Sequence, residues 1–171
     1  MMRQITLSPY LFHKACAKAK DQQQPLPNYK DYVNSSPKFK YVMGCIASAF
    51  AWHKKTSTKP GGHVIYMNVG TEYFPLLKQY LVKELGLKEN QVGIVIGGMS
   101  KGAKETAKNR FLSGDILVLI GSSTISVGVD LQTNATTGYN CYYDWNPTDA
   151  AQIEGRIWRQ GNRFAARKVE P

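Results

Sequence analysis

The chain has 171 residues, of which 22 are Lys or Arg and 12 are Asp or Glu, so its formal net charge is +10 at pH 7. This length predicts one domain with a sizeable core, and the absence of a long apolar run excludes a membrane-spanning protein. A basic excess of this size indicates a polyanionic partner, nucleic acid before membrane.

The three cysteines, Cys16, Cys45 and Cys141, are far apart and form no CxxC pair. This spacing argues against a zinc site and against a disulfide framework, so we expect no metal ligands and buried free thiols in a reducing cytoplasm. The N-terminus lacks a charged stretch followed by an apolar run, and we therefore expect no secretory signal.

Residues 1–35 are predicted to form an N-terminal helix and a linker. The helix lies in "SPYLFHKACAKAK", where Ser8 can cap it and Pro9 suits its first position, and "DQQQPLPN" indicates the linker. A second helix is predicted to begin at Pro37, with Ser36 as its cap. Its apolar residues fall on one helical face: Phe39, Val42, Met43, Ile46 and Phe50.

After Gly62, short apolar strands alternate with amphipathic helices. The predicted strands are "HVIYMN", "QVGIVIGG", "ILVLIG" and "TGYNCYYD", the helices between them are "TEYFPLLKQYLVKELG" and "SKGAKETAKNRFLSG", and Pro147 opens a final helix. This alternation predicts an α/β fold with a mainly parallel central sheet and helices on both faces. Ligands of such sheets collect at the carboxyl ends of the strands, so we expect the site in the loops after the strands.

The final predicted helix places Arg156 and Arg159 on the same face as Gln152. Two guanidiniums on one face near a strand end match a site for a phosphate chain, because Arg offers a bidentate fork to phosphate oxygens. Gly155 is a poor helix former and is explained if something approaches the backbone closely. The arginine pair alone also fits a solvated basic face that pairs loosely with Glu154, and by itself favours that interpretation.

The whole stretch "DWNPTDAAQIEGRIWRQGN" resembles motif VI of the superfamily 2 helicases, and its "WNP" is similar to the Swi/Snf-type branch of double-stranded DNA translocases. "GSSTISVGVDLQ" resembles motif V, "GHVIYMNVGTEYF" stands where motif IV belongs, and "SPKFKYVM" resembles the entry to the second motor lobe. The resemblance covers residues 36 to 162. It implies that residues 36–171 form a second RecA-like lobe, a three-layer sandwich, as a fragment of a larger protein.

The resemblance implies an ATP-dependent DNA helicase or translocase whose nucleotide lies between two lobes. ATP and Mg²⁺ would be held mainly by a first lobe of the same full-length protein, which this chain lacks, so the isolated chain is expected to be inactive. Arg156 and Arg159 would be arginine fingers that reach the ATP phosphates. Gln152, Gly128 and Asp130 would contact the nucleotide or couple its pocket to the nucleic-acid track.

Four further residues are candidates for nucleic-acid contacts, and DNA is favoured over RNA as the partner: Ser123, Thr124, Lys101 and Lys104. The two hydroxyl residues could instead cap the short helix that follows them. One departure from the Swi/Snf pattern is Asn162, which stands where that branch usually has Gln.

Two other functions remain open on the sequence. One is a non-catalytic basic α/β module that binds nucleic acid. The other is an independent Rossmann-type enzyme, which would need a glycine fingerprint after the first strand, whereas "YMNVGTEYF" has one Gly there. The spacing in "GGMSKGAKET" is wrong for a phosphate loop.

Overall fold

The structure is a computed structural model that describes residues 7–11, 26–126, 131–142, 151, 154–155, 161–162 and 164. Its strands are β1 (Gly62–Tyr66), β2 (Val92–Val95), β3 (Val118–Gly121) and β4 (Ala135–Asn140). Its helices are α3 (Tyr29–Asn34), α4 (Pro37–Lys55), α5 (Phe74–Lys83), α6 (Lys101–Ser113) and α7 (Ser123–Ser126), with 3-10 turns η1 (Thr71–Tyr73) and η2 (Glu89–Gln91).

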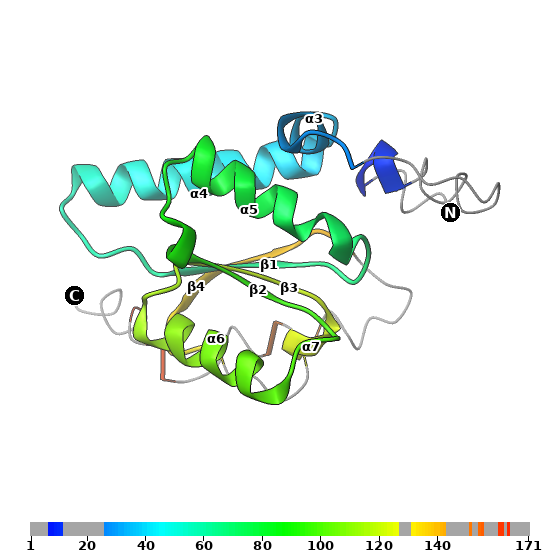
Figure 1. Cartoon of the computed structure of the whole chain (residues 1–171). Helices are drawn as coiled ribbons and strands as arrows, with labels where there is room; N and C mark the ends of the chain where they lie inside the picture. Colours follow the sequence, from blue (N-terminus) through cyan, green and yellow to red (C-terminus); the bar gives the residue numbers. More distant parts are fainter. Residues whose placement is uncertain are drawn as a thin grey trace.

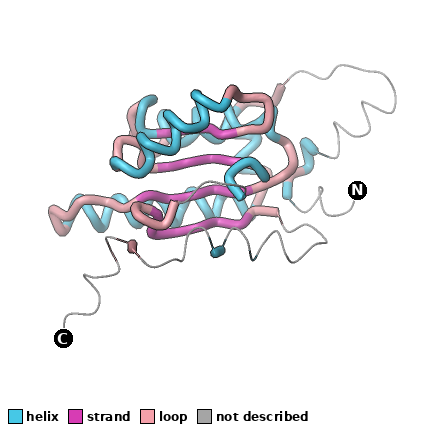
Figure 2. The backbone as a smooth tube through the Cα atoms, turned by 90° about the horizontal axis from the view of Figure 1, so that it is seen from below, coloured by secondary structure: helices cyan, strands magenta, loops and turns pink. Residues whose placement is uncertain are grey.

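The strands form one sheet in the order β2-β3-β1-β4, and they lie side by side in Figure 2. β1 pairs with β3 through His63 and Val118, and with β4 through His63 and Thr137. Each of these pairings is parallel, as is that of β2 with β3. Parallel neighbours need crossover connections, which pass over the faces of the sheet. The predicted mainly parallel sheet is confirmed.

Helices cover both faces of this sheet and give three layers (Figure 1). α3, α4 and α5 lie on one face, while α6 and α7 lie on the other. Alternate residues of β1 point into two separate cores, Ile65 on the α4 side and Val64 and Tyr66 on the α6 side. Because both faces are covered, β1 and β3 are buried along their whole length.

α4 begins and packs as the sequence predicts. The Phe39 amide donates to the Oγ of Ser36 at 3.2 Å, and Pro37 occupies the first turn. Phe39 and Ile46 are fully buried, and Phe50 packs half-buried beside them. Although α4 has 19 residues, no helix in the described ranges is long and apolar enough to cross a membrane.

α6 also has the predicted ends. The Ala103 amide donates to Ser100 Oγ at 3.3 Å at the N-terminus, and Gly114 ends the helix with a positive φ of 88°. Phe111 is the residue through which α6 enters the core.

α3 is a helix that the sequence analysis missed, since it falls in the range 1–35 predicted as an N-terminal helix and linker. The Asn28 side chain caps the N-terminus of α3, because its Oδ1 accepts from the Lys30 amide at 2.9 Å. Tyr32 is fully buried in the core shared with α4 and α5. The Lys30 ammonium lies 3.0 Å from the Glu84 carboxylate, which fastens α3 to the end of α5.

β4 begins two residues earlier than predicted. The Gly62 amide donates to the Asn134 carbonyl oxygen at 2.8 Å, and Ala135 is already in register with Gly62, so pairing starts before Thr137. The predicted end of this strand beyond Tyr142 lies outside the described residues. So do residues 12–20 of the predicted N-terminal helix and most of the helix predicted from Pro147.

Candidate functional site

The carboxyl ends of β2 and β3 lie side by side at one edge of the sheet. Val95 and Gly121, the last residues of these strands, are register partners, and the Ser122 amide donates to the Val95 carbonyl oxygen at 3.2 Å. The connections that lead to α6 and α7 therefore start next to each other. The predicted nucleic-acid-binding residues lie just beyond these connections, Lys101 and Lys104 in the first turn of α6 and Ser123 and Thr124 in α7.

The turn from β3 into α7 depends on Gly121. A Cβ at this glycine would lie 1.6 Å from Ile125 Cδ1, so only glycine lets the buried Ile125 close over the strand end in this way. Ser122 is buried, its carbonyl accepts from the Ile125 amide at 2.9 Å, and its Oγ lies 3.0 Å from Thr124 Oγ1. Ser123 is exposed at the start of α7. Ser123 and Thr124 thus lie inside α7, and the preceding Ser122, which the sequence analysis missed, orients the Thr124 hydroxyl.

The connection from β2 to α6 offers open backbone and cations. A Cβ at Gly97 would meet nothing within 4 Å, so space surrounds the chain there. Lys101 is exposed and Lys104 is half-buried, and within the described part of the chain neither forms an ion pair, whereas Lys108 pairs with Glu105 at 3.5 Å. The ammonium groups of Lys101 and Lys104 are therefore available to an anion outside the chain.

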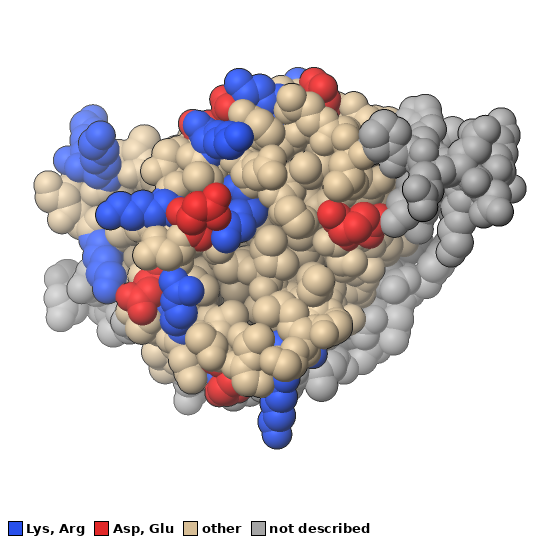
Figure 3. All heavy atoms as spheres, in the orientation of Figure 1, with Lys and Arg blue, Asp and Glu red and all other residues tan. Residues whose placement is uncertain are grey.

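Cationic side chains do not gather in one patch on the face shown in Figure 3. Lys and Arg lie mostly over the left part of this face and at its top and bottom, with Asp and Glu between them. On this face, cations that alternate with carboxylates favour several separate contacts with a polyanion over one concentrated site.

The residues implied by motifs V and VI lie outside the described residues, and their roles stay predictions: Gly128, Asp130, Gln152, Arg156 and Arg159. Asn162, at the end of the motif VI stretch, is described. Its Nδ2 donates to the Ala135 carbonyl oxygen, and its Oδ1 accepts from the Phe164 amide at 2.8 Å. The Asn162 amide therefore fastens this end of the stretch to the first residue of β4.

Two buried titratable groups near the sheet serve packing. Burial, with a smaller effect of nearby His53, lowers the pKa of His63 to about 4, and its Nδ1 lies 3.1 Å from the Tyr139 hydroxyl. Burial raises the pKa of the Cys141 thiol to about 12, so this thiol is protonated and unreactive at neutral pH. Cys45 and Cys141 are free, and Cys141 is buried as expected.

ATP needs donors to its phosphate oxygens, and Mg²⁺ needs oxygen ligands. Within the described residues, no three His, Cys, Asp or Glu side chains lie close enough to hold a metal ion. The chemistry that they offer at the carboxyl edge consists of hydroxyls and ammonium groups, which suit phosphate oxygens.

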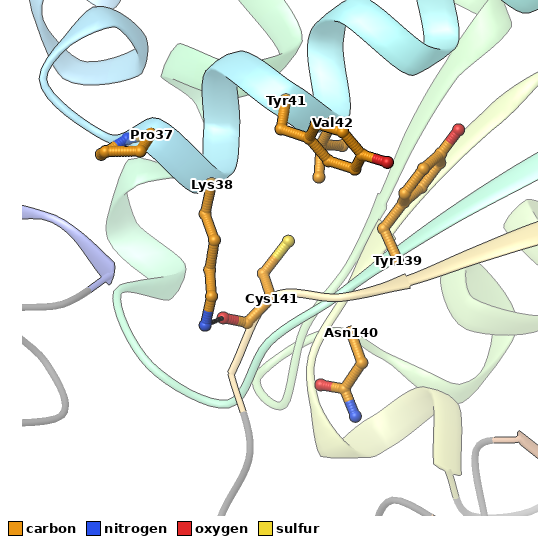
Figure 4. A pocket seen from close by; sticks show the side chains of 7 residues that line it. All are labelled: Pro37, Lys38, Tyr41, Val42, Tyr139, Asn140 and Cys141. Atoms are coloured by element: carbon orange, nitrogen blue, oxygen red, sulfur yellow. Dashed lines mark hydrogen bonds between the residues drawn. The ribbon is translucent and has the colours of Figure 1, made fainter.

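A pocket of about 440 Å³ lies between the N-terminal half of α4 and the end of β4. Lys38, Tyr41 and Val42 line it from α4, and Tyr139 and Cys141 line it from the β4 side (Figure 4). The Lys38 ammonium donates to the Cys141 carbonyl oxygen at 3.0 Å. The sequence gives no sign of this pocket, because the residues of its two walls are far apart in the chain.

The model of the helicase conserved C-terminal domain matches residues 39–161, which is most of the chain. The chain belongs to this family. The family match confirms the resemblance to the C-terminal domain of helicases, and the assignment to the Swi/Snf-type branch stays a prediction. The matched range of this helicase C-terminal domain includes the motif V stretch and all of the motif VI stretch except its last residue, Asn162.

Two solved structures are similar to this helicase domain. The C-terminal part of the Fun30 ATPase domain is 17% identical, with a TM-score of 0.61, and the alignment covers 90% of this chain and 46% of that one. The Sulfolobus solfataricus SWI2/SNF2 ATPase C-terminal domain is 18% identical, with a TM-score of 0.46 and coverages of 70% and 42%. The first likeness confirms the RecA-like α/β fold, and the chain spans less than half of each of these structures. No curated protein sequence matches the chain.

Proposed function

We propose that this helicase C-terminal domain is the second motor lobe of an ATP-dependent DNA helicase or translocase of the Swi/Snf type. It would work in the cytoplasm beside a first lobe of the same full-length protein. The observation that carries the proposal is the family match over residues 39–161, which includes Arg156 and Arg159. The parallel sheet supports it, because the connections that lead to these hydroxyls and lysines start side by side at its carboxyl edge.

Arg156 and Arg159 are assigned to the ATP phosphates. Phosphoryl transfer spreads negative charge over the phosphate oxygens, and a guanidinium placed against them stabilises that charge. Gln152 would contact the nucleotide or hold an arginine in place, while Gly128 and Asp130 would couple the nucleotide pocket to the nucleic-acid track. When bound, Mg²⁺ neutralises phosphate charge, and we assign its coordination to the first lobe.

The nucleic-acid track is assigned to the first turn of α6 and to α7, which follow the adjacent carboxyl ends of β2 and β3. Ser123 and Lys101 are exposed there, and Thr124 and Lys104 are half-buried. Hydroxyls and ammonium groups bind the sugar-phosphate backbone without reading base sequence. Binding is therefore expected to be independent of sequence and strongly weakened by salt.

The test is ATP hydrolysis by the complete protein with and without duplex DNA. Arg156→Ala or Arg159→Ala should lower DNA-stimulated hydrolysis by roughly a thousandfold, because a guanidinium stabilises the transition state, and should leave DNA affinity nearly unchanged. Lys54→Ala, at an exposed lysine of α4, is the matched control and should alter neither quantity. Full DNA-stimulated hydrolysis by both arginine variants would show that the motif VI assignment is wrong.

Lys101→Ala and Lys104→Ala provide the converse arm of this experiment. Each should weaken DNA binding and make the salt dependence shallower, since fewer counterions are released, while hydrolysis at saturating DNA stays near normal. An unchanged salt dependence in both variants would exclude these lysines from the track.

A second candidate is a non-catalytic basic module that binds nucleic acid, favoured by the net charge of +10 and by the exposed lysines. It predicts that the complete protein binds DNA with the expected salt dependence but shows no DNA-stimulated hydrolysis. The sequence of the full-length protein also separates the two, because a motor requires a phosphate loop in a first lobe.

A further inference from the structure

The outward face of α4 carries no charge between Tyr41 and Trp52. These two aromatic side chains are 73% and 56% exposed, and because they are eleven residues apart they lie on one face, about 16 Å from each other. The residues between them on that face are small and exposed: Gly44, Ala47, Ser48 and Ala51. We call Tyr41, Trp52 and these four residues the α4 outer face.

Two features of this face work against the stability of the helix that carries it. Gly44 lies mid-helix, where Gly is less favourable than Ala, and a Cβ there would meet nothing within 4 Å, so the fold of the chain does not require glycine. The first turn holds Lys38 and Lys40 and no acidic residue, although cations are unfavourable at a helix N-terminus. Both features are explained if a partner approaches Gly44 closely and brings negative charge.

Cations stand at both ends of the α4 outer face. Lys38 and Lys40 are exposed before Tyr41, Lys54 and Lys55 are exposed after Trp52, and within the described residues none of the four forms an ion pair. The pocket lies at the N-terminal end of the face, with Tyr41 in its wall, and its volume of about 440 Å³ can admit an aromatic or branched apolar side chain (Figure 4). Such a pocket beside small residues is the arrangement of an interaction anchor.

We propose that the α4 outer face docks an amphipathic helix of a partner protein, with an apolar anchor side chain in the pocket and acidic residues near both helix ends. A duplex is a poorer match, because it places a charge about every 1.7 Å along its axis and would lay unneutralised phosphates on the apolar stretch. A second copy of the chain would set its own lysines against Lys40 and Lys55. This inference does not depend on the proposed motor function.

The test uses the full chain and two fluorescein-labelled synthetic helices of about five turns. Both have the same Leu and Ala face, one with Glu at both ends and the other with Lys at both ends. Fluorescence anisotropy should show the acidic helix binding at least tenfold more tightly than the basic one. Gly44→Lys and Trp52→Ala should each weaken that binding at least tenfold, because they block close packing and remove an aromatic contact.

Gly44→Ala is the matched control, since it adds a methyl group in open space and improves helix propensity, and it should fold and bind almost as the parent does. Thermal melting followed by circular dichroism checks that the Lys variant is also folded. Failure to bind the acidic helix, equal binding of both helices, or binding unaffected by Gly44→Lys would overturn the proposal. It would equally be overturned if Trp52→Ala weakened duplex DNA binding instead, or if light scattering showed a dimer that Gly44→Lys dissociates.

Discussion

The two long helices on opposite faces of the sheet, α4 and α6, hold to the core in different ways. α4 has 19 residues and buries Phe39, Val42, Met43 and Ile46, whereas α6 has 13 residues and buries Phe111 alone. The outward side of α4 is uncharged over three turns, while that of α6 carries Lys101, Glu105 and other polar residues. α4 thus has a buried apolar side and an uncharged outer side, and α6 is a solvated helix with a single buried apolar side chain.

This difference between α4 and α6 shows that the residues that stabilise a helix can be distinct from those that are free to contact other molecules. A helix with several buried side chains stays packed on the core when one of them is truncated. Its outward residues are then not needed for folding. A helix with one buried side chain depends on that residue, and its remaining positions are free to carry charge for solubility or for binding.

The largest effect on stability is expected from Phe111→Ala. Truncating this fully buried ring leaves a cavity against Val64 and Leu119 and should lower the free energy of unfolding by about 4 kcal/mol. Ile46→Ala should cost about 3 kcal/mol, but α4 keeps its other buried side chains. Hydrogen exchange distinguishes the two helices. In Phe111→Ala, the amides of α6 should exchange faster than global unfolding of that variant allows. In Ile46→Ala, the amides of α4 should exchange only as fast as global unfolding allows. Equal protection of α6 in the parent and in Phe111→Ala would contradict the interpretation that α6 depends on a single buried side chain.

The α4 side of the sheet should also make stability depend on pH. His63 packs there between Phe50 and Tyr139, and burial holds its pKa at about 4 in the folded chain, below the ordinary value of 6.5. Between these values the unfolded chain binds a proton that the folded chain does not, so stability is full above pH 6.5 and falls toward pH 4. The free energy of unfolding should drop by up to about 3 kcal/mol across this window.

Urea denaturation at pH 7 and pH 4.5 measures this loss. His63→Phe should flatten the pH dependence, while His53→Gln, at a half-exposed histidine, is the control that should retain most of it. A parent protein whose unfolding free energy is the same at both values would show that His63 is not kept neutral by burial.

The smallest effect concerns the two helix caps. Ser36 is fully buried and caps α4, whereas Ser100 caps α6 in an exposed position. Ser36→Ala leaves a buried amide without its acceptor and should cost about 2 kcal/mol, against about 0.5 kcal/mol for Ser100→Ala, where water can replace the hydroxyl. Thermal unfolding of the two variants measures the difference, and equal losses would remove this contrast between the helices.

Local signals predicted much of the fold. Ser36 with Pro37 and the spacing of apolar residues predicted α4, and Ser100 with Gly114 predicted α6, because caps act within one turn of the chain. α3 was missed because its six residues are too few for a periodic pattern, and its place depends on the distant contact between Lys30 and Glu84.

For the candidate site, the sequence predicted which segments follow the strand ends, while the roles of its residues stay predictions. The strand ends located the segments with Ser123 and Lys101, since parallel strands bring their carboxyl ends to one edge. The pocket was not predictable, because Lys38 and Tyr139 meet only in the folded chain. The uncharged run from Tyr41 to Trp52 was the available signal for the α4 outer face, once α4 was known to be amphipathic.

The central position of β1 has a consequence for how the chain folds. β1 is made first of the four strands, yet its two partners, β3 and β4, follow only after α5, β2 and α6. Sheet formation therefore requires closure of long loops, and proteins dominated by such non-local pairing fold more slowly than helical bundles. During synthesis, helices such as α4 can form while the backbone N–H and C=O groups along both edges of β1 still lack their partners. This leaves a period in which β1 is open to intermolecular pairing.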